Sequence, residues 1–438
     1  MPKNTVWFTD MIIVAHGAKA RTRIMRNRMV TRLARLSQVI LLAVALVMPS
    51  HAHAEVRTSD RIGDRSAAEA PHQQAAFAPS VTAAAGVLVT ASGRTLWARN
   101  ADERRAMASI TKVMTALVVR ERTSLDELVT VSSRAASVRE ASARLRDGQT
   151  YPVRTLLEAM LVRSGNDAAV ALAEHVAGDV GSFVELMNVR AAELGLADTL
   201  FANVHGLDAE GHYSSAYDLA TLARFAMRDA EIRRMVQLSS LTIDAVGGPT
   251  ELENSNLLLG TVEGATGVKT GWTSRAGFCL AASAERGGEE LFAVVLGTDS
   301  ETDRFQEAGL LLEWGFARYR EERLAEPGEL IGRVPVSGYL DVSVSALVGA
   351  PVAVRVLDIG GPVVRRVTLR PSLEPPVHTG DRVGTLSFVQ GERLIAQIPL
   401  VSEDSVNRPS PLTRVHVAAV RIWRSVFGSP PEAQVPVP

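Results

Sequence analysis

Residues 106–117 read AMASITKVMTAL, an apolar, helix-forming run that places a serine and a lysine three residues apart. Residues i and i+3 share one face of a helix, so the amine of Lys112 can reach the hydroxyl of Ser109. Backbone N–H groups in a first helical turn are unpaired, and the helix dipole there favours negative charge. We therefore expect a helix that opens near Ser109 and supplies a nucleophile, a base and half of an oxyanion hole. The plainer alternative is that Ser109 is only the N-cap of this helix.

Lysine is rare in this chain. It occurs at positions 3, 19, 112 and 269 only, which leaves 43 arginines among the 47 basic residues. Arginine stays protonated at any working pH, whereas a buried lysine can lose its proton and act as a base. The lysine count therefore marks Lys112 and Lys269 as chemically special.

Residues 1–54 have the features of a secretory signal peptide. Their first part carries eight Lys or Arg and one Asp, and the apolar run VILLAVALVM at 39–48 precedes an Ala-His-Ala cleavage site. The apolar run is too short to cross a bilayer comfortably, which takes about 20 residues. We predict cleavage after Ala54 and a true start at Met25 or Met29. An uncleaved N-terminal anchor is the alternative.

Export has consequences for charge and for cysteine chemistry. Residues 1–54 carry a net charge of +7, so their removal takes the chain from −1 to −8, which argues against a nucleic-acid partner. Cys279 is the only cysteine, which excludes an intramolecular disulfide. It lies in the apolar run FCLAASA at 278–284, where we expect a small buried hydrophobe. Residues 55–79 are polar and aperiodic and are predicted to form a flexible leader.

Residues 80–322 have the pattern of an α/β (α+β) domain. Strands are predicted at 83–91, 94–100, 278–285 and 290–298, with helices between them and a further helix over about 303–319. Ser182 and Ser215 are the predicted N-caps of two of these helices. The order predicts one antiparallel sheet flanked by helices.

Residues 323–408 are predicted to form a small β-rich domain, because alternating runs at 352–357, 363–369, 383–388 and 394–400 are separated by turn residues. Residues 409–438 form a tail with an amphipathic pattern. One face of the predicted helix is apolar and consists of Val415, Ala419, Ile422, Trp423, Val426 and Phe427. The other face carries Arg414, Arg421 and Arg424. Such a helix can lie in a membrane interface, and docking on the protein's own surface is the alternative.

Two further triplets accompany Ser109 and Lys112. Ser164-Gly165-Asn166 lies in a loop after the apolar run 155–162, where a hydroxyl can relay a proton and a carboxamide can hold an amide substrate. Lys269-Thr270-Gly271 is predicted to open an edge strand, and its glycine to let a substrate backbone lie alongside. Each triplet is a weak signal alone, but the three in this order and spacing are a strong one.

Together these motifs resemble those of the serine D-alanyl-D-alanine carboxypeptidases, the low-molecular-mass penicillin-binding proteins. The stretches VRSGNDAAVALAEHVAG at 162–178 and GVKTGWTSRAGFCLAASA at 267–284 are also similar to this family, and the likeness spans roughly residues 80–405. The chain departs from the family pattern at Met107, at Trp272 and in the stretch 137–148. The resemblance implies a penicillin-binding, β-lactamase-like catalytic fold that needs no metal and no cofactor.

The resemblance also implies a role for each matching residue. Ser109 would attack the penultimate D-Ala carbonyl of a peptidoglycan stem peptide, with Lys112 as base, and β-lactams would acylate the same serine. In the second triplet, Ser164 and Asn166 would assist proton transfer and hold the peptide. Lys269 and Thr270 of the third triplet would bind the terminal carboxylate, with the help of Arg304 from a distant part of the sequence. The backbone N–H groups of Ser109 and Trp272, which follows Gly271, would form the oxyanion hole.

Two other functions are alternatives to this one. A class A β-lactamase carries a deacylating Glu between the second and third motifs, and no Glu-x-x-Leu-Asn run occurs between residues 166 and 269. A catalytically idle cell-wall scaffold would not need an intact Ser109 and Lys112. His175, His205 and His212 are scattered and are expected to be structural. We therefore expect an exported carboxypeptidase, periplasmic or otherwise extracytoplasmic, attached to the outer face of the cytoplasmic membrane.

Overall fold

The computed structural model describes residues 78–138 and 140–427. The predicted signal peptide and all but the last two residues of the predicted leader lie outside these ranges. The N-terminal part of the described chain is built on a five-stranded antiparallel sheet of order β2-β1-β9-β8-β7. Its strands are β1 Ala85–Thr90, β2 Thr95–Arg99, β7 Ala265–Thr273, β8 Gly277–Arg286 and β9 Glu289–Thr298.

The sheet brings the two ends of this part of the chain together. β1 pairs with β9, so the N-terminal hairpin adds to the strands that follow the helices, which confirms the predicted antiparallel sheet. β7 lies at the edge of the sheet, as predicted. It begins at Ala265, however, so Lys269-Thr270-Gly271 lies inside the strand and does not open it.

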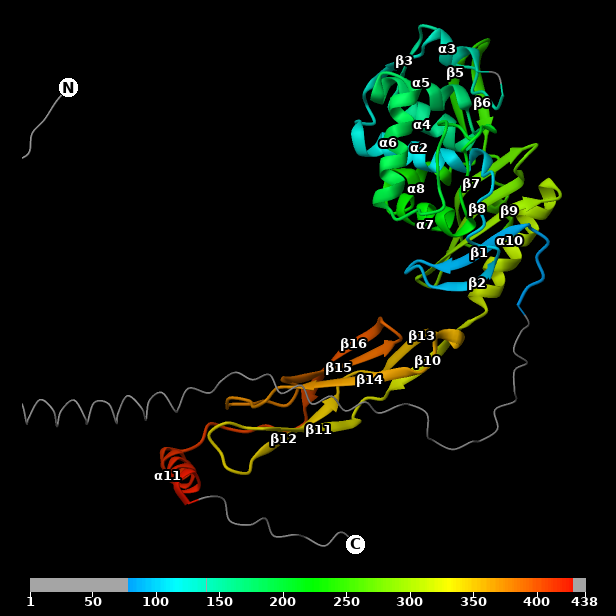
Figure 1. The fold of residues 1–438 in the computed structure, drawn as a ribbon. Helices are drawn as coiled ribbons and strands as arrows, with labels where there is room; N and C mark the ends of the chain where they lie inside the picture. The colour runs from blue at the N-terminus through cyan, green and yellow to red at the C-terminus, as the bar shows by residue number, and fades with distance from the viewer. Residues whose placement is uncertain (1–77, 139, 428–438) are drawn as a thin grey trace, which may run out of the picture.

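Side chains alternate across the sheet and supply two separate cores. In β1, Val87 and Val89 face a core shared with most of the helices, whereas Leu88 faces a core shared with α10 (Glu301–Phe316). Figure 1 shows α10 on one side of the sheet and most of the helices that precede it on the opposite side. The helices and short elements on that opposite side are η1 Ala108–Thr111, α2 Lys112–Arg122, α3 Ser133–Ser137, α4 Val153–Val162, α5 Asn166–Ala177, α6 Val180–Glu193, α7 Ala216–Ala226 and α8 Ala230–Val236, with the hairpins β3 Leu128–Thr130 with β4 Thr150–Pro152 and β5 Ser240–Ala245 with β6 Gly248–Glu253. The short helix α9 Leu258–Thr261 packs on the α10 side, because Leu258 belongs to the core that α10 shares.

The helix caps were predicted with mixed success. Ser215 caps α7 as expected, because its side chain accepts from the N–H of Asp218. The prediction for Ser182 is wrong: Asp179 caps α6 and accepts from the N–H of Ser182, so the helix begins earlier. α10 spans Glu301–Phe316 and so begins and ends a few residues earlier than the predicted helix over about 303–319, since Ser300 is its N-cap.

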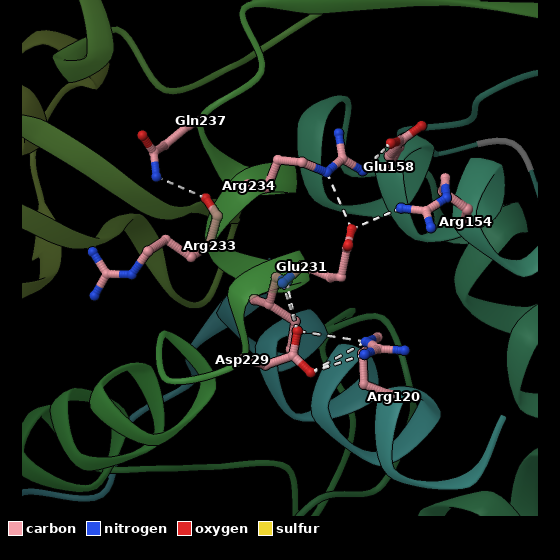
Figure 2. Close-up of polar contacts among 9 residues, drawn as sticks. Arg120, Arg154, Glu158, Asp229, Glu231, Arg233, Arg234 and Gln237 are labelled. Atoms are coloured by element: carbon pink, nitrogen blue, oxygen red, sulfur yellow. Dashed lines mark hydrogen bonds and ion pairs between the residues drawn. The ribbon is translucent and has the colours of Figure 1, made fainter. Parts of the chain in front are cut away.

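α8 is tied to its neighbours by ion pairs, which Figure 2 shows. Its N-cap Asp229 binds Arg120 of α2, with 3.2 Å between Oδ2 and Nη2. Glu231 in its first turn accepts from Arg154 of α4 at 2.7 Å. Because α8 in turn packs on β7, these ion pairs hold the helix that supports the edge strand.

The C-terminal part of the described chain is rich in strands, as predicted. β10 Tyr319–Ala325 pairs with β13 Val352–Leu357, and a second five-stranded sheet has the order β11-β12-β16-β15-β14. The strands of this second sheet are β11 Leu330–Pro335, β12 Ser343–Val348, β14 Val363–Leu369, β15 Arg382–Gln390 and β16 Arg393–Ser402. These strands enclose a hydrophobic core of their own, and the predicted alternating runs correspond to β13, β14, β15 and β16.

The predicted tail helix is present as α11 (Pro411–Phe427). Figure 1 shows it at the end of the β-rich part that lies away from the first sheet. Val417 is buried, and Arg421 donates to the carbonyl of Tyr339 at 3.4 Å. None of the described helices is both long and apolar enough to cross a membrane.

Candidate active site

Ser109 and Lys112 are brought together as predicted. Ser109 lies in η1, a single turn of 3-10 helix, and Lys112 is the first residue of α2. The Lys112 Nζ donates to the Ser109 Oγ at 2.9 Å and to the carbonyl of His205 at 2.6 Å. Ser109 caps neither helix, because Met107 and Thr111 are the N-cap residues. The N-cap alternative is therefore wrong.

A buried hydrogen-bond chain holds the turn that carries Ser109. His212 accepts from the N–H of Ala202 through Nδ1 at 3.0 Å, so a neutral His212 carries its proton on Nε2. This Nε2 lies 2.8 Å from Oγ1 of Thr111, which donates to the carbonyl of Ala108 at 2.9 Å. Burial lowers the pKa of His212 to about 4, so the ring is neutral near pH 7. His212 is structural, as expected.

Two glycines allow other segments to approach this turn closely. A Cβ at Gly271 would lie 2.9 Å from the Cβ of Ala108 and from the N of Ser109. A Cβ at Gly206 would lie 2.0 Å from the carbonyl oxygen of Ala108, and the φ of +96° at Gly206 also favours glycine. The glycine of the third motif is thus needed for contact with the nucleophile turn, a reason that differs from the predicted one. The sequence did not single out Gly206.

Burial and like charge shift the pKa values of both lysines downward. Lys112 is fully buried, and its pKa lies well below the usual value because of burial and then the charge of Lys269, against the opposing effect of Asp167. Burial and the charge of Arg304 lower the pKa of Lys269 to about 7. The charges of Lys269, in the third motif, and of Asp167, the residue after the second motif, both act on Lys112. A neutral Lys112 is able to accept a proton.

The second motif presents buried polar atoms without partners. Ser164 has a φ of +69°, and within the described chain its buried Oγ has no hydrogen-bond partner. Asn166 donates through Nδ2 to the carbonyl of Glu140 at 2.6 Å, while its Oδ1 is likewise unpaired there. Buried polar atoms without partners are rare, so these two are available for a ligand.

Asp167 positions the loop in front of this motif, and sequence analysis missed that role. Its carboxylate accepts from the N–H of Ala143 at 2.9 Å, from the N–H of Leu145 at 3.1 Å and from the hydroxyl of Ser142 at 2.7 Å. The loop belongs to the stretch that departs from the family pattern. Asp167 lies in the first turn of α5, but its partners lie more than twenty residues away in sequence, so no local pattern pointed to them.

The third motif is held from two sides. Thr270 lies with its Oγ1 2.6 Å from the Oγ of Ser255, a residue that sequence analysis did not single out. Lys269 donates to the carbonyl of Thr270 at 3.1 Å. Arg304, in the first turn of α10, is buried and donates to the carbonyl of Gly271 at 3.2 Å.

Trp272 is exposed beside the motif, with 57% of its surface accessible. Its ring lies 6.0 Å from that of Phe278, which in turn lies under the guanidinium of Arg304 at 5.5 Å. Cys279, in the same strand as Phe278, is buried and its pKa is raised to about 11 by burial. It is therefore a protonated core residue, as expected.

Comparison with known proteins identifies the family. The family model described as D-alanyl-D-alanine carboxypeptidase, Peptidase S11, matches residues 72–300, and the model of the penicillin-binding protein 5 C-terminal domain matches residues 319–408. The chain belongs to the D-alanyl-D-alanine carboxypeptidase family. This membership confirms the predicted family, fold class and enzyme class, and it favours neither the β-lactamase nor the scaffold alternative.

Individual relatives and solved structures agree with this family. The D-alanyl-D-alanine carboxypeptidase DacC of Escherichia coli is 33% identical over 372 residues, covering 82% of this chain and 92% of the relative. DacF of Bacillus subtilis is 30% identical over 333 residues, covering 74% and 85%. The crystal structure of penicillin binding protein 6B from Escherichia coli is similar with a TM-score of 0.55 and 34% identity, covering 74% of this chain and 96% of that one.

Proposed function

We propose that Ser109 is the nucleophile and Lys112 the base of a serine-type D-alanyl-D-alanine carboxypeptidase. The observation that carries this proposal is the buried Lys112 amine, with its lowered pKa, 2.9 Å from the Ser109 hydroxyl. A neutral amine keeps a hydrogen on the carbonyl of His205 and turns its lone pair toward the proton of Ser109.

The reaction proceeds through an acyl-enzyme. Ser109 Oγ attacks the carbonyl of the penultimate D-Ala while its proton passes to Lys112. The C–N bond then breaks, the departing D-Ala amine takes up a proton, and water hydrolyses the ester on Ser109. The backbone N–H groups of Ser109 and Trp272 stabilise the oxyanion. The close approach of Gly271 to the Ser109 amide supports this pairing of the edge strand with the nucleophile turn.

The second motif completes the proton path and holds the peptide. Ser164 relays the proton from Lys112 to the leaving amine, and the Oδ1 of Asn166 accepts from an amide of the substrate. Both assignments are supported by buried oxygen atoms that have no partner among the residues described. A substrate supplies the missing hydrogen bonds.

The third motif binds the terminal carboxylate of the substrate. Lys269 and Arg304 are buried close enough for the charge of one to lower the pKa of the other. An anion relieves such repulsion between two cations. Thr270 adds a hydroxyl donor. Arg304 donates through Nη1 to the carbonyl of Gly271 and is ion-paired through Nη2 with the exposed Glu301, so its charge adds to that of Lys269 only in part.

Substrate class and location follow from the same proposal. The substrate is a peptidoglycan stem peptide that ends in D-Ala-D-Ala, and β-lactams acylate Ser109 in its place. Because this substrate lies outside the cytoplasm, the enzyme acts there. We assign catalysis to a domain of residues 80–322, followed by a β-rich domain of residues 323–408 and the tail from 409. Since β10 already begins at Tyr319, the division lies near that residue.

The tail attaches the enzyme to the membrane surface. Leu412, Val415, Ile422, Trp423 and Val426 of α11 are all more than half exposed. The side of the helix that contacts the protein carries Val417 and Arg421 instead. The apolar face therefore points away from the protein, which supports insertion into a lipid interface over docking on the protein's own surface.

Release of D-alanine from an acyl-D-Ala-D-Ala peptide tests the function. The wild-type protein should release it, and Ser109→Ala should not. A fluorescent penicillin separates the alternatives: a lasting adduct indicates the carboxypeptidase, rapid turnover a β-lactamase, and no acylation a scaffold. Either of the last two results contradicts the proposal.

A further inference from the structure

Thr270 has a side-chain partner from outside the three motifs. The Oγ of Ser255 lies 2.6 Å from the Oγ1 of Thr270, and no other side-chain partner of Thr270 occurs among the described residues. Ser255 lies between β6 and α9, far from the motif in sequence. Its backbone N–H donates at 3.3 Å to the carbonyl of Val162, the last residue of α4. Ser255 therefore links the edge strand to the end of the helix that leads into Ser164.

The backbone around Ser255 is fixed independently of its hydroxyl. The side chain of Asn254 donates to the carbonyls of Leu238 at 2.8 Å and Val236 at 3.2 Å. It also accepts from the N–H of Asn256 at 2.9 Å. Removal of the Ser255 hydroxyl alone should therefore leave the segment in place.

Hydrogen-bond chemistry then sets the direction of the bond between the two hydroxyls. A hydroxyl can donate once and accept as well, whereas an ionised carboxylate only accepts. When Thr270 gives its hydrogen to the substrate carboxylate, its own oxygen can accept only from Ser255. Successive hydrogen bonds of this kind polarise and strengthen one another.

We infer that Ser255 is a positioning residue for the carboxylate site: its hydroxyl donates to Thr270 and thereby turns the hydroxyl hydrogen of Thr270 toward the free C-terminus of the substrate. This inference rests on the proposed role of Thr270 in carboxylate binding. Ser255 thus contributes to the preference for substrates with a free carboxyl end. It takes no part in the attack by Ser109.

Ser255→Ala tests the inference on two substrates, an acyl-D-Ala-D-Ala peptide with a free carboxylate and a neutral thioester. On the peptide, kcat/KM should fall about three- to tenfold, the size of one neutral hydrogen bond, and most of the loss should be a rise in KM. On the thioester the loss should stay under about twofold. Ser255→Thr, which keeps a hydroxyl, should restore the peptide activity. Ser240→Ala is the matched control, because it removes a hydroxyl that bonds an exposed Glu251.

A double mutant separates a specific role from a structural one. In a Thr270→Val background, Ser255→Ala should cause no further loss on the peptide, because the residue through which it acts is gone. Equal losses on both substrates, or a loss that persists in that background, would overturn the inference alone. If Thr270→Val by itself affects both substrates equally, the proposed carboxylate role of Thr270 fails, and the inference fails with it.

Discussion

The candidate active site and the C-terminal helix depart in opposite directions from the usual rule that polar side chains are exposed and apolar ones buried. The candidate active site buries two lysines and leaves oxygens of Ser164 and Asn166 without partners in the described chain, although buried charges and unpaired polar atoms are unfavourable. α11 instead exposes large apolar side chains, which are unfavourable in water. In our proposal each departure is relieved by a different ligand, a peptide at the candidate active site and a lipid surface at the helix. The two regions should therefore fail independently.

The largest expected effect comes from Lys112→Arg. Arginine keeps the positive charge but does not give up its proton, so it is unable to accept one from Ser109. Acylation by a fluorescent penicillin should slow by at least about a thousandfold, while binding of the protein to lipid vesicles stays unchanged. Circular dichroism would confirm that the variant is folded. A rate within about tenfold of wild type would remove Lys112 from the role of base.

Substitutions in α11 should have the opposite effect, weakening membrane binding and leaving catalysis unchanged. The triple variant Ile422→Ser, Trp423→Ser and Val426→Ser should weaken binding to vesicles that contain anionic lipid by about a hundredfold, since interfacial burial of large apolar side chains is lost. Release of D-alanine from a soluble peptide should not change. The control is Leu330→Ser with Leu394→Ser, two exposed apolar residues of the β-rich part. If the control weakens binding as much as the helix variant, membrane attachment does not depend on α11.

Lys269→Arg sharpens the description of the candidate active site itself. The variant keeps a charge but replaces a compact ammonium with a planar group in a fully buried position. We expect kcat/KM to fall about tenfold more on the peptide with a free carboxylate than on a neutral thioester. Steady-state kinetics on the two substrates measure this ratio. Equal losses on both would mean that Lys269 acts in the chemical step.

The smallest effect concerns pH. In the proposed mechanism Lys112 acts when deprotonated, so acylation of a neutral thioester should be lost as pH falls through the pKa of Lys112, which lies well below the usual value for lysine. The charge of Lys269 is one cause of that low pKa. Lys269→Gln should therefore move the rising limb of the pH profile upward by a few tenths of a unit to about one unit. An unmoved limb would show that the two lysines are not coupled.

Sequence reasoning predicted the residues of the candidate active site but not the contacts that hold them. Local pattern predicted Ser109 with Lys112 on one face, because spacing along a helix sets that geometry. It did not predict the 3-10 turn, which is packed against Gly206 and Gly271, segments far away in the chain. Asp167 and Ser255 were missed for the same reason, since their partners lie far from them in sequence. The cap of α6 was misplaced because Asp179 and Ser182 are both good capping residues and only the backbone decides between them.

The most direct test of the catalytic assignment is mass spectrometry of the protein after reaction with a penicillin. A single covalent adduct should map to the peptide that contains Ser109 and persist after free penicillin is removed. It should be absent from Ser109→Ala and form only slowly in Lys112→Arg. An adduct on any other residue, or undiminished labelling of Ser109→Ala, would contradict the assignment.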